Sequence, residues 1–477
     1  MIEFDRDFVM TINGRSVASN NAFPVYNPAN RRAFANAPDA SREQLDDAVS
    51  GAAAAFESWR KEPYAVREKA LNAMADLMEA NAAEFMALLT REQGKPKAGA
   101  EWEVFGSIHW CRELAKQRLE DEILEDTDAR RVVTRFAPLG VVGGITPWNF
   151  PILLAIWKIA PALISGNTMV LKPSPFTPLC TLKLGELMRD ELPAGVFNVV
   201  SGGDDLGKWM TAHPGISKIA FTGHTETGKR VMQSSAGSLK RLTLELGGND
   251  PAIVLPDVDA KAVAPELFWA AFQNNAQFCN ATKRLYVHED IYDDVLKELV
   301  EYAKTVKVSD GAEDGAQLGP IQNAPQYEKV MDYFEDCKKN GYRFAVGGDI
   351  DNSAQGWFIP VTLVDNPPED SRIVQEEPFG PILPVLKWRD DADVVRRAND
   401  TPYGLGASVW GKDLERVARI GEQIDAGTVW LNEIHMYSPG QTFGGAKESG
   451  IGYENGVAGL KGYAQAKTVT INKQPKF

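Results

Sequence analysis

The stretch that decides the fold is Lys218-Ile-Ala-Phe-Thr-Gly-His-Thr-Glu-Thr-Gly-Lys-Arg230. It begins with a short apolar run, passes through a loop of glycine and threonine, and continues into a helical pattern over residues 228–236. A short, continuous apolar run is typical of a strand that is buried on both faces, as in a parallel sheet. The stretch therefore predicts one strand–loop–helix unit of an α/β fold.

The same alternation of strand and helix extends on both sides of this unit. Helical periodicity dominates residues 40–120, where Ser41 is placed to cap a helix over residues 43–59. Further strands are expected at residues 131–136, 140–145, 169–172, 196–200, 252–255, 284–287, 342–346, 382–387 and 428–432, with helices at 152–166, 181–189, 262–276 and 291–306. This alternation predicts mostly parallel sheets in two closely packed α/β domains that meet near residue 246.

Composition limits the classes of partner. The chain has 477 residues, 44% hydrophobic and 24% charged, and its net charge of −14 disfavours nucleic acid and anionic membranes. No run of 18 apolar residues occurs, and Met1–Asp7 has no apolar core, so we expect neither a membrane span nor a secretion signal. Dispersed cysteines without a zinc or disulfide pattern indicate no metal site and a cytoplasmic protein: Cys111, Cys180, Cys279 and Cys337.

The glycine loop after the first-quoted strand allows two interpretations. Gly223 and the pair Gly228-Lys229 almost complete a nucleotide-binding P-loop, but Arg230 stands where a magnesium-binding Ser or Thr is needed. The pattern Gly223-x-Thr225-x-x-Gly228 instead resembles a variant dinucleotide turn, in which the helix N-terminus faces a pyrophosphate. A plain strand-to-helix turn is the alternative.

Three residues have surroundings that suit catalysis. Cys279 lies among polar amides, unlike a structural thiol. Glu245 follows an apolar run and precedes two glycines, so partial burial would raise its pKa towards that of a general base. Asn149 lies between two prolines, and a rigid side-chain amide is what an oxyanion site needs. The simpler alternatives are that Cys279 is an inert thiol and that Asn149 is an asparagine in a turn.

Seven stretches in sequence order resemble the aldehyde dehydrogenase superfamily, and the resemblance runs along essentially the whole chain. The step from Glu245 to Cys279 fits the family as well. The stretches are Pro147-Trp-Asn-Phe-Pro151, Gly166-Asn-Thr168 with Lys172-Pro-Ser174, Phe221-Thr-Gly223, Glu245-Leu-Gly-Gly248, Gln277-x-Cys-x-Ala281, Glu377-Pro-Phe-Gly-Pro381 and Phe443-Gly-Gly-x-Lys-x-Ser-Gly450.

The resemblance implies two Rossmann-like α/β domains plus a small β oligomerisation arm. Residues 1–117 and 138–246 would form the NAD(P)-binding domain, and 247–448 the catalytic domain. Residues 118–137 and 463–477 would form oligomerisation strands of a homodimer or homotetramer. From the sequence itself, the strand at residues 467–472 has no obvious partner nearby, so pairing across an interface and a simple edge strand both remain open.

The resemblance also implies the roles of single residues. Cys279 would be the nucleophile, Glu245 the base that activates water, and Asn149 the oxyanion donor together with the Cys279 N–H. Lys172, which we group with these three catalytic-site residues, would contact the adenosine ribose. Glu377 would contact the nicotinamide ribose. The full set of expected cofactor contacts is Ile145, Thr146, Pro147, Trp148, Lys172, Ser174, Pro175, Phe221, Gly223, His224, Thr225, Gly228, Glu245, Leu246, Gly247, Glu377 and Phe379.

The sequence departs from the family pattern at the cofactor positions. Pro175 stands where a glutamate often accepts hydrogen bonds from the adenosine ribose, and without that negative charge NADP is not excluded, although we favour NAD. His224 replaces the usual serine, and we favour a surface-filling role over a pyrophosphate contact. Tyr453 replaces a common arginine outside the chemistry.

The resemblance places an aromatic, largely apolar substrate channel beside the nucleophile. Its expected lining lacks Arg and Lys, which favours aromatic or medium aliphatic aldehydes over semialdehydes that carry a carboxylate. A CoA-acylating enzyme is the other alternative, and Glu245 argues for hydrolysis because those relatives characteristically lack that base. A non-catalytic role would predict loss of Cys279 or Glu245. The expected lining is Phe150, Leu154, Trp157, Gln273, Phe278, Asn280, His435, Tyr437 and Phe443.

Overall fold

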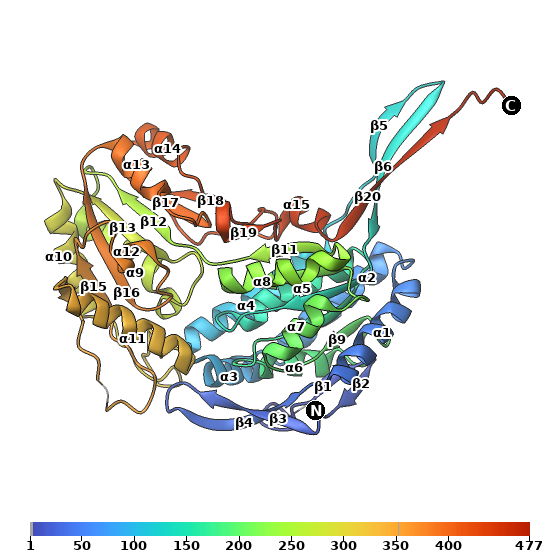
Figure 1. Ribbon diagram of the computed structural model, residues 1–477, viewed down its shortest axis with the longest axis horizontal. Coiled ribbons are helices and arrows are strands. Elements are labelled where there is room, and N and C mark those ends of the chain that lie inside the picture. The colour runs from blue at the N-terminus through green and yellow to red at the C-terminus, as the bar shows by residue number, and fades with distance from the viewer. Residues whose placement is uncertain (1–2, 352) are drawn as a thin grey trace.

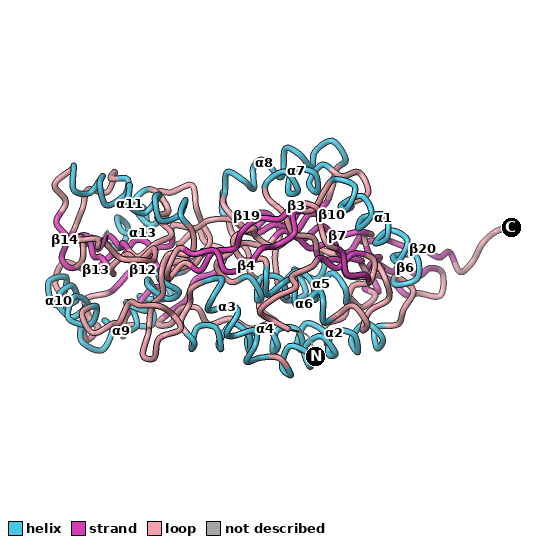
Figure 2. The backbone as a smooth tube through the Cα atoms, turned by 90° about the horizontal axis from the view of Figure 1, so that it is seen from below, coloured by secondary structure: helices cyan, strands magenta, loops and turns pink. Residues whose placement is uncertain are grey.

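The computed structural model describes residues 3–351 and 353–477, so Met1 and Ile2 of the N-terminal segment considered above lie outside the described residues. The chain forms two lobes and a thin arm that projects from one of them (Figure 1). Each lobe is built on a sheet that lies between layers of helices (Figure 2). The predicted α/β class is therefore confirmed.

The first lobe contains an eight-stranded sheet in the order β19-β11-β10-β7-β8-β9-β1-β2. Its five central strands are parallel, and the strands at its two edges are antiparallel. The strands are β1 (Met10–Ile12), β2 (Arg15–Val17), β7 (Val141–Ile145), β8 (Thr168–Lys172), β9 (Phe197–Val199), β10 (Lys218–Thr222), β11 (Arg241–Glu245) and β19 (Gly450–Ile451). Strand order reverses between β7 and β10, and parallel sheets bind ligands at such a point.

Helices cover both faces of this sheet. Ser41 caps the first helix through a capping box with Gln44, as predicted. Helix α8 begins three residues earlier than expected, because His224 caps it by accepting a hydrogen bond from the Glu226 N–H at 3.3 Å. The helices are α1 (Arg42–Trp59), α2 (Tyr64–Ala80), α3 (Ala82–Gln93), α4 (Lys97–Ala115), α5 (Pro151–Ile164), α6 (Leu179–Leu187), α7 (Asp204–Ala212) and α8 (Thr225–Ser235), and β3 (Asn21–Asn27) pairs with β4 (Arg32–Asp39) in a separate hairpin.

The second lobe contains a seven-stranded sheet in the order β14-β15-β16-β13-β12-β17-β18, parallel except for β14. Its strands are β12 (Asp250–Val254), β13 (Thr282–His288), β14 (Arg343–Val346), β15 (Thr362–Asp365), β16 (Ile382–Trp388), β17 (Gly406–Trp410) and β18 (Thr428–Leu431). Its helices are α9 (Ala260–Phe272), α10 (Tyr292–Ala303), α11 (Ala324–Lys339), α12 (Arg372–Gln375), α13 (Asp391–Asn399) and α14 (Leu414–Gly421), and α15 (Gly456–Lys461) leads back to the arm. The chain passes from the first sheet to the second between Glu245 and Asp250.

The helix expected over residues 262–276 ends at Phe272. The next residues, Asn274, Asn275 and Ala276, all adopt left-handed backbone conformations with φ of 52°, 56° and 60°. Such a run cannot continue a right-handed helix, and it costs free energy most clearly at Ala276, because alanine gains nothing locally from this conformation. The strained turn leads directly to Cys279.

The arm is a three-stranded antiparallel sheet of β5 (Glu122–Asp126), β6 (Arg130–Pro138) and β20 (Ala464–Asn472). The C-terminal strand therefore has a partner within the chain, and it forms an edge of this small sheet along the full length of β6. Figure 1 shows the arm standing clear of both lobes. Within residues 3–351 and 353–477, the helices are all too short or too polar to cross a membrane.

Candidate active site

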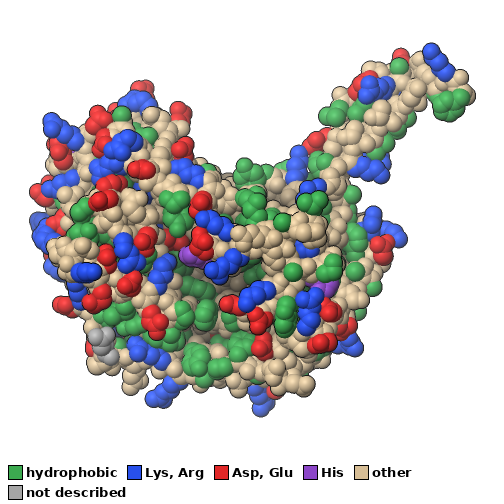
Figure 3. All heavy atoms as spheres, in the orientation of Figure 1, with side chains coloured by type: hydrophobic (Ala, Val, Ile, Leu, Met, Phe, Trp, Pro, Cys, Tyr) green, Lys and Arg blue, Asp and Glu red, His purple; other side chains and the backbone are tan. Residues whose placement is uncertain are grey.

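The site lies where the two lobes meet and the molecular surface is hollowed (Figure 3). The loop after β7 carries Trp148 and Asn149, and the loop after β10 carries Gly223. These loops leave the carboxyl ends of the two strands between which the strand order reverses. The second lobe contributes the turn before β13, which holds Cys279.

Two cavities meet at Cys279. One has a volume of about 590 Å³ and the other about 580 Å³. Their walls share Asn149, Leu154, Thr222, Leu246 and Cys279. A thiol at this junction can contact molecules that enter from both sides.

The first cavity is aromatic. Six residues of the expected substrate channel line it: Phe150, Leu154, Trp157, Phe278, Tyr437 and Phe443. The sequence analysis did not expect Trp102 and Trp110 of α4, Leu153 or Thr222 at this site, and it expected Leu246 only as a cofactor contact. The indole nitrogens of Trp110 and Trp157 are buried, with no hydrogen-bond partner in the described part of the chain.

The structure corrects the expectation for three residues, Gln273, Asn280 and His435, which do not line this cavity. The His435 ring hydrogen-bonds to the Gln273 side chain and to the Asn280 carbonyl, both at 3.1 Å. Phe278 lines the cavity and stacks on this imidazole at 4.5 Å. The three polar residues support the wall instead of forming it, and burial lowers the pKa of His435 to about 4.

The second cavity contains eight of the expected cofactor contacts: Pro147, Trp148, Gly223, His224, Leu246, Gly247, Glu377 and Phe379. Gln326 and Lys329 of α11 also line it and were not expected. The rings of Trp148 and Phe379 meet edge to face at 5.4 Å. A Cβ at Gly247 would lie 2.4 Å from the Glu377 carboxylate, so only glycine permits this approach.

The other expected cofactor residues lie outside the wall of this cavity: Ile145, Thr146, Lys172, Ser174, Pro175, Phe221, Thr225, Gly228 and Glu245, the last of which lines the first cavity. Lys172 ends β8 with its ammonium buried; its Nζ donates to the Pro173 carbonyl at 3.4 Å, and no carboxylate lies within ion-pair distance in the described ranges. Burial lowers its pKa to about 8. An unpaired buried cation and the N-terminus of α8 suit a phosphorylated, dinucleotide-sized molecule that extends from the second cavity. His224 is exposed at the cavity mouth and also caps α8, a role not weighed from the sequence.

Cys279 is partly exposed at the end of the left-handed turn. Desolvation raises the pKa of its thiol to about 12, and the nearby carboxyl groups of Asp250, Glu377 and Glu245 act in the same direction. The Lys283 ammonium opposes them and favours the thiolate.

Glu245 ends β11 and lines the first cavity beside Cys279. Both carboxyl oxygens are buried without a hydrogen-bond partner among the residues described. Burial, reinforced by the charge of Glu454, holds the pKa of Glu245 well above its usual range. Lys158 opposes this shift, donating to Glu454 at 2.8 Å and to the Thr222 hydroxyl at 2.7 Å.

Hydrogen bonds hold both the side-chain amide and the main-chain carbonyl of Asn149. Its Nδ2 donates to the Gln277 carbonyl at 3.1 Å, which uses one of two amide hydrogens. Its own carbonyl accepts from Lys95 at 3.0 Å and from Asn274 at 3.1 Å. Lys95 in turn forms a buried ion pair with Glu103. No sequence pattern predicted this pair, because both residues lie about 50 positions from Asn149, Lys95 in the short link between α3 and α4 and Glu103 within α4.

No group of three or more His, Cys, Asp or Glu side chains that could hold a metal ion occurs in the part of the chain that the structure covers. The chemistry available at the junction is that of a thiol, an unpartnered carboxyl group and a fixed amide.

Comparisons with known proteins show similarity along almost the whole chain. The model of the "Aldehyde dehydrogenase family" matches residues 16–469. A probable aldehyde dehydrogenase from Pseudomonas sp is 42% identical, covering 98% of this chain and 95% of its own. A phenylacetaldehyde dehydrogenase from Pseudomonas fluorescens is 40% identical, covering 97% and 95%. Among solved structures, the NAD+ complex of an aldehyde dehydrogenase from Bacillus cereus superposes with a TM-score of 0.95 at 36% identity, covering 98% and 97%.

Proposed function

The chain belongs to the aldehyde dehydrogenase family, and we propose that it oxidises an aldehyde to the carboxylic acid through a thioester on Cys279, with NAD as hydride acceptor. One observation carries the proposal: Cys279 stands at the junction of an aromatic cavity and a second cavity, with Glu245 and Asn149 in the walls. This arrangement lets an aldehyde and a cofactor approach the same thiol from opposite sides.

In the first step, the Cys279 thiolate attacks the aldehyde carbon and forms a tetrahedral oxyanion. The second amide hydrogen of Asn149, which its bond to Gln277 leaves free, and the Cys279 N–H donate to this oxyanion. The bonds from Lys95 and Asn274 to the Asn149 carbonyl fix the amide before the charge develops.

The oxyanion collapses to a thioester as hydride leaves for NAD, whose nicotinamide supplies the acceptor when it is bound in the second cavity. Glu377 would hold the nicotinamide ribose, and Phe379 would pack near the nicotinamide ring. Lys172 would contact the adenosine ribose, and the 223–228 loop would contact the phosphates. We propose NAD over NADP, and the Bacillus cereus relative, solved as an NAD+ complex, supports this choice. Because Pro175 brings no negative charge against a 2′-phosphate, NADP remains the alternative cofactor.

In the last step, Glu245 removes a proton from the water that hydrolyses the thioester. Its unpartnered oxygens are free to accept that hydrogen bond, and its raised pKa makes it a stronger base than an exposed glutamate. A CoA-acylating enzyme would not need this carboxyl group, so Glu245 supports hydrolysis.

We propose an aromatic or medium aliphatic aldehyde as substrate. The first cavity has no Arg or Lys in its wall, so the carboxylate of a semialdehyde would be buried there without a partner. The relative that acts on phenylacetaldehyde supports an aromatic group in the equivalent place.

The test combines phenylacetaldehyde, hexanal and succinate semialdehyde with NAD or NADP, and follows the absorbance of the reduced cofactor. A Cys279→Ala variant provides the control. We expect CoA-independent turnover of phenylacetaldehyde and hexanal with NAD, and none in the variant. Turnover only after CoA is added would establish the acylating alternative, and preferred oxidation of the semialdehyde would overturn the proposed substrate class.

A further inference from the structure

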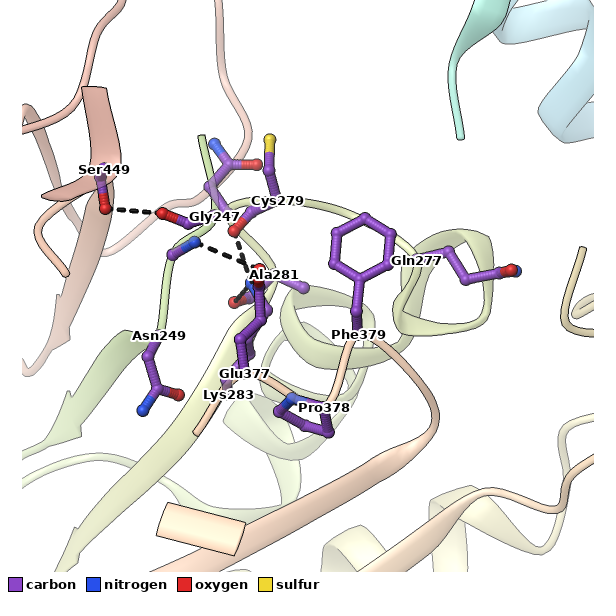
Figure 4. Close-up of polar contacts among 12 residues, drawn as sticks. Gly247, Asn249, Gln277, Cys279, Ala281, Lys283, Glu377, Pro378, Phe379 and Ser449 are labelled. Carbon is purple, nitrogen blue, oxygen red and sulfur yellow. Dashed lines mark hydrogen bonds and ion pairs between the residues drawn. The ribbon is translucent and has the colours of Figure 1, made fainter. Parts of the chain in front are cut away.

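Lys283 is a buried lysine that the proposed mechanism does not use. It is the second residue of β13, and its side chain is 3% exposed. Its Nζ donates to the carbonyl oxygen of Cys279 and lies 3.3 Å from Oε1 of Glu377 (Figure 4). One ammonium group thus contacts both the main chain of the predicted nucleophile and the carboxylate that faces the second cavity.

The Glu377 carboxylate extends this contact to a third segment. The same Oε1 accepts from the N–H of Gly248 at 3.1 Å, three residues after Glu245. The carbonyl of the neighbouring Gly247 accepts from the Ser449 hydroxyl at 2.6 Å (Figure 4). The ion pair therefore joins the Cys279 turn, the segment after Glu245 and the Glu377 loop at one point.

The charges around Lys283 are mostly acidic. Glu377 and Asp250 of the second lobe lie near it, and the nearby cation Lys329 donates to the Glu377 main-chain carbonyl at 2.8 Å. Burial raises the pKa of Asp250 to about 7, so near neutrality this carboxyl group carries only part of its charge. The charge of Lys283 also acts on His435, which is neutral near pH 7 because burial lowers its pKa to about 4.

We propose that Lys283 is a positioning residue of this site, which fixes the Cys279 main chain against Glu377 and whose charge favours the Cys279 thiolate. The inference rests on the proposed role of Cys279 as nucleophile. A lysine with a purely structural role would stabilise the fold but would not change the acidity of a neighbouring thiol, and this difference allows a test.

The experiment measures the rate at which iodoacetamide alkylates Cys279 as a function of pH, without aldehyde or cofactor. Peptide mass spectrometry identifies the modified residue, since the other cysteines are buried. The variants are Lys283→Met, which keeps the length of the side chain but removes its charge, and Lys283→Arg, which keeps the charge. Lys304→Met removes an exposed lysine of the surface next to α10 and is the matched control.

We expect Lys283→Met to raise the apparent thiol pKa by about one unit and slow alkylation about tenfold at pH 7.5. Lys283→Arg should recover most of this rate, and Lys304→Met should match the wild type. A folded Lys283→Met protein that alkylates at the wild-type rate would overturn the proposal.

A second variant keeps the test decisive if Lys283→Met does not fold. Lys283→Gln keeps a hydrogen-bond donor at this position but removes the charge, so alkylation should become slower than in the wild type. An unchanged or faster rate would contradict the inference. Because this readout needs no turnover, it is separate from the aldehyde assay: inactivity of the wild type towards every aldehyde would reject the proposed function alone.

Discussion

At the scale of single residues, Asn149 combines a fixed position with one free donor. Replacing it by Ala removes the side-chain donor and leaves the Cys279 N–H, so kcat should fall about 10²–10³-fold, as for loss of one oxyanion donor elsewhere. Steady-state kinetics with phenylacetaldehyde measure this loss. Iodoacetamide alkylation of Cys279 should stay near the wild-type rate, and a parallel loss of thiol reactivity would mean that Asn149 acts on the thiol instead.

Glu245 gives a prediction about pH. Burial raises the pKa of Glu245, so the carboxyl group becomes a base only at a pH above the usual range for glutamate. Hydrolysis of the thioester, and with it kcat, should therefore increase with pH and then level off. Glu245→Gln should remove this dependence.

The same variant separates the two half-reactions. Glu245→Gln should still release about one equivalent of reduced cofactor per active site in a rapid burst, because only thioester hydrolysis needs the base. Stopped-flow absorbance measures the burst. A variant without any burst would place Glu245 in thiol activation as well.

Residue chemistry was predictable from sequence where the residue carries its signal locally. Cys279, Glu245 and Asn149 stand in unusual neighbourhoods, and the structure brings all three to the wall of one cavity. Glu103 and Trp110 gave no such signal, since a glutamate and a tryptophan within a helix are ordinary, and neither did Lys95 in the short link before α4. Only the packing of α4 against α5 places them at the site.

At the scale of elements, the start of α5 is held by a side chain from another helix. Glu103 of α4 accepts from the N–H groups of Ile152 at 2.9 Å and Leu153 at 3.3 Å, and it pairs with Lys95. One carboxylate thus satisfies the free donors of a helix N-terminus and neutralises a buried cation.

Glu103→Ala should destabilise the protein by about 3–5 kcal/mol, because it leaves Lys95 buried without its partner. Urea denaturation measures the change in unfolding free energy. Lys95→Met with Glu103→Leu, which removes both charges, should recover much of this stability. It should not recover kcat, because the bond to the Asn149 carbonyl is gone. If the double variant recovered kcat as fully as stability, Lys95 would not position Asn149.

The elements themselves were predictable to different degrees. Buried strands such as β8 and β10 are apolar runs and were located correctly. Strand β17 and helices α11, α13 and α14 were not proposed. The end of α9 was also missed, because the left-handed turn over residues 274–276 depends on tertiary bonds: Asn275 Nδ2 donates to the Gly319 carbonyl at 2.7 Å.

At the scale of the whole molecule, the passage between the two sheets falls between Glu245 and Asp250, close to the expected residue 246. The change from one run of strand and helix to the next marks it in sequence. The position of the arm was not predictable from pattern alone, since β6 and β20 are more than 300 residues apart and pair only in the folded chain.

The arm leads to the last prediction, which concerns assembly. We propose a homodimer or homotetramer held partly by the arm. Its strand β5 exposes Ile123 by 57% and Leu124 by 65%, and β20 has one main-chain edge that pairs with no other strand of the described residues. A projecting sheet with an open edge and apolar side chains is costly in water unless a second copy covers it.

Replacing both Ile123 and Leu124 by Lys should weaken the assembly at least about a hundredfold in dissociation constant, since each buried side chain contributes about 1.5–3 kcal/mol. Light scattering after size exclusion should move towards the chain mass of 52.3 kDa, while the wild type stays at a multiple of it. Leu414→Lys, which adds a charge at an equally exposed leucine on α14, is the control and should leave the mass unchanged. If the double variant keeps the wild-type mass, these two arm residues are not part of the interface; if the wild type is itself a monomer, the arm covers no second copy.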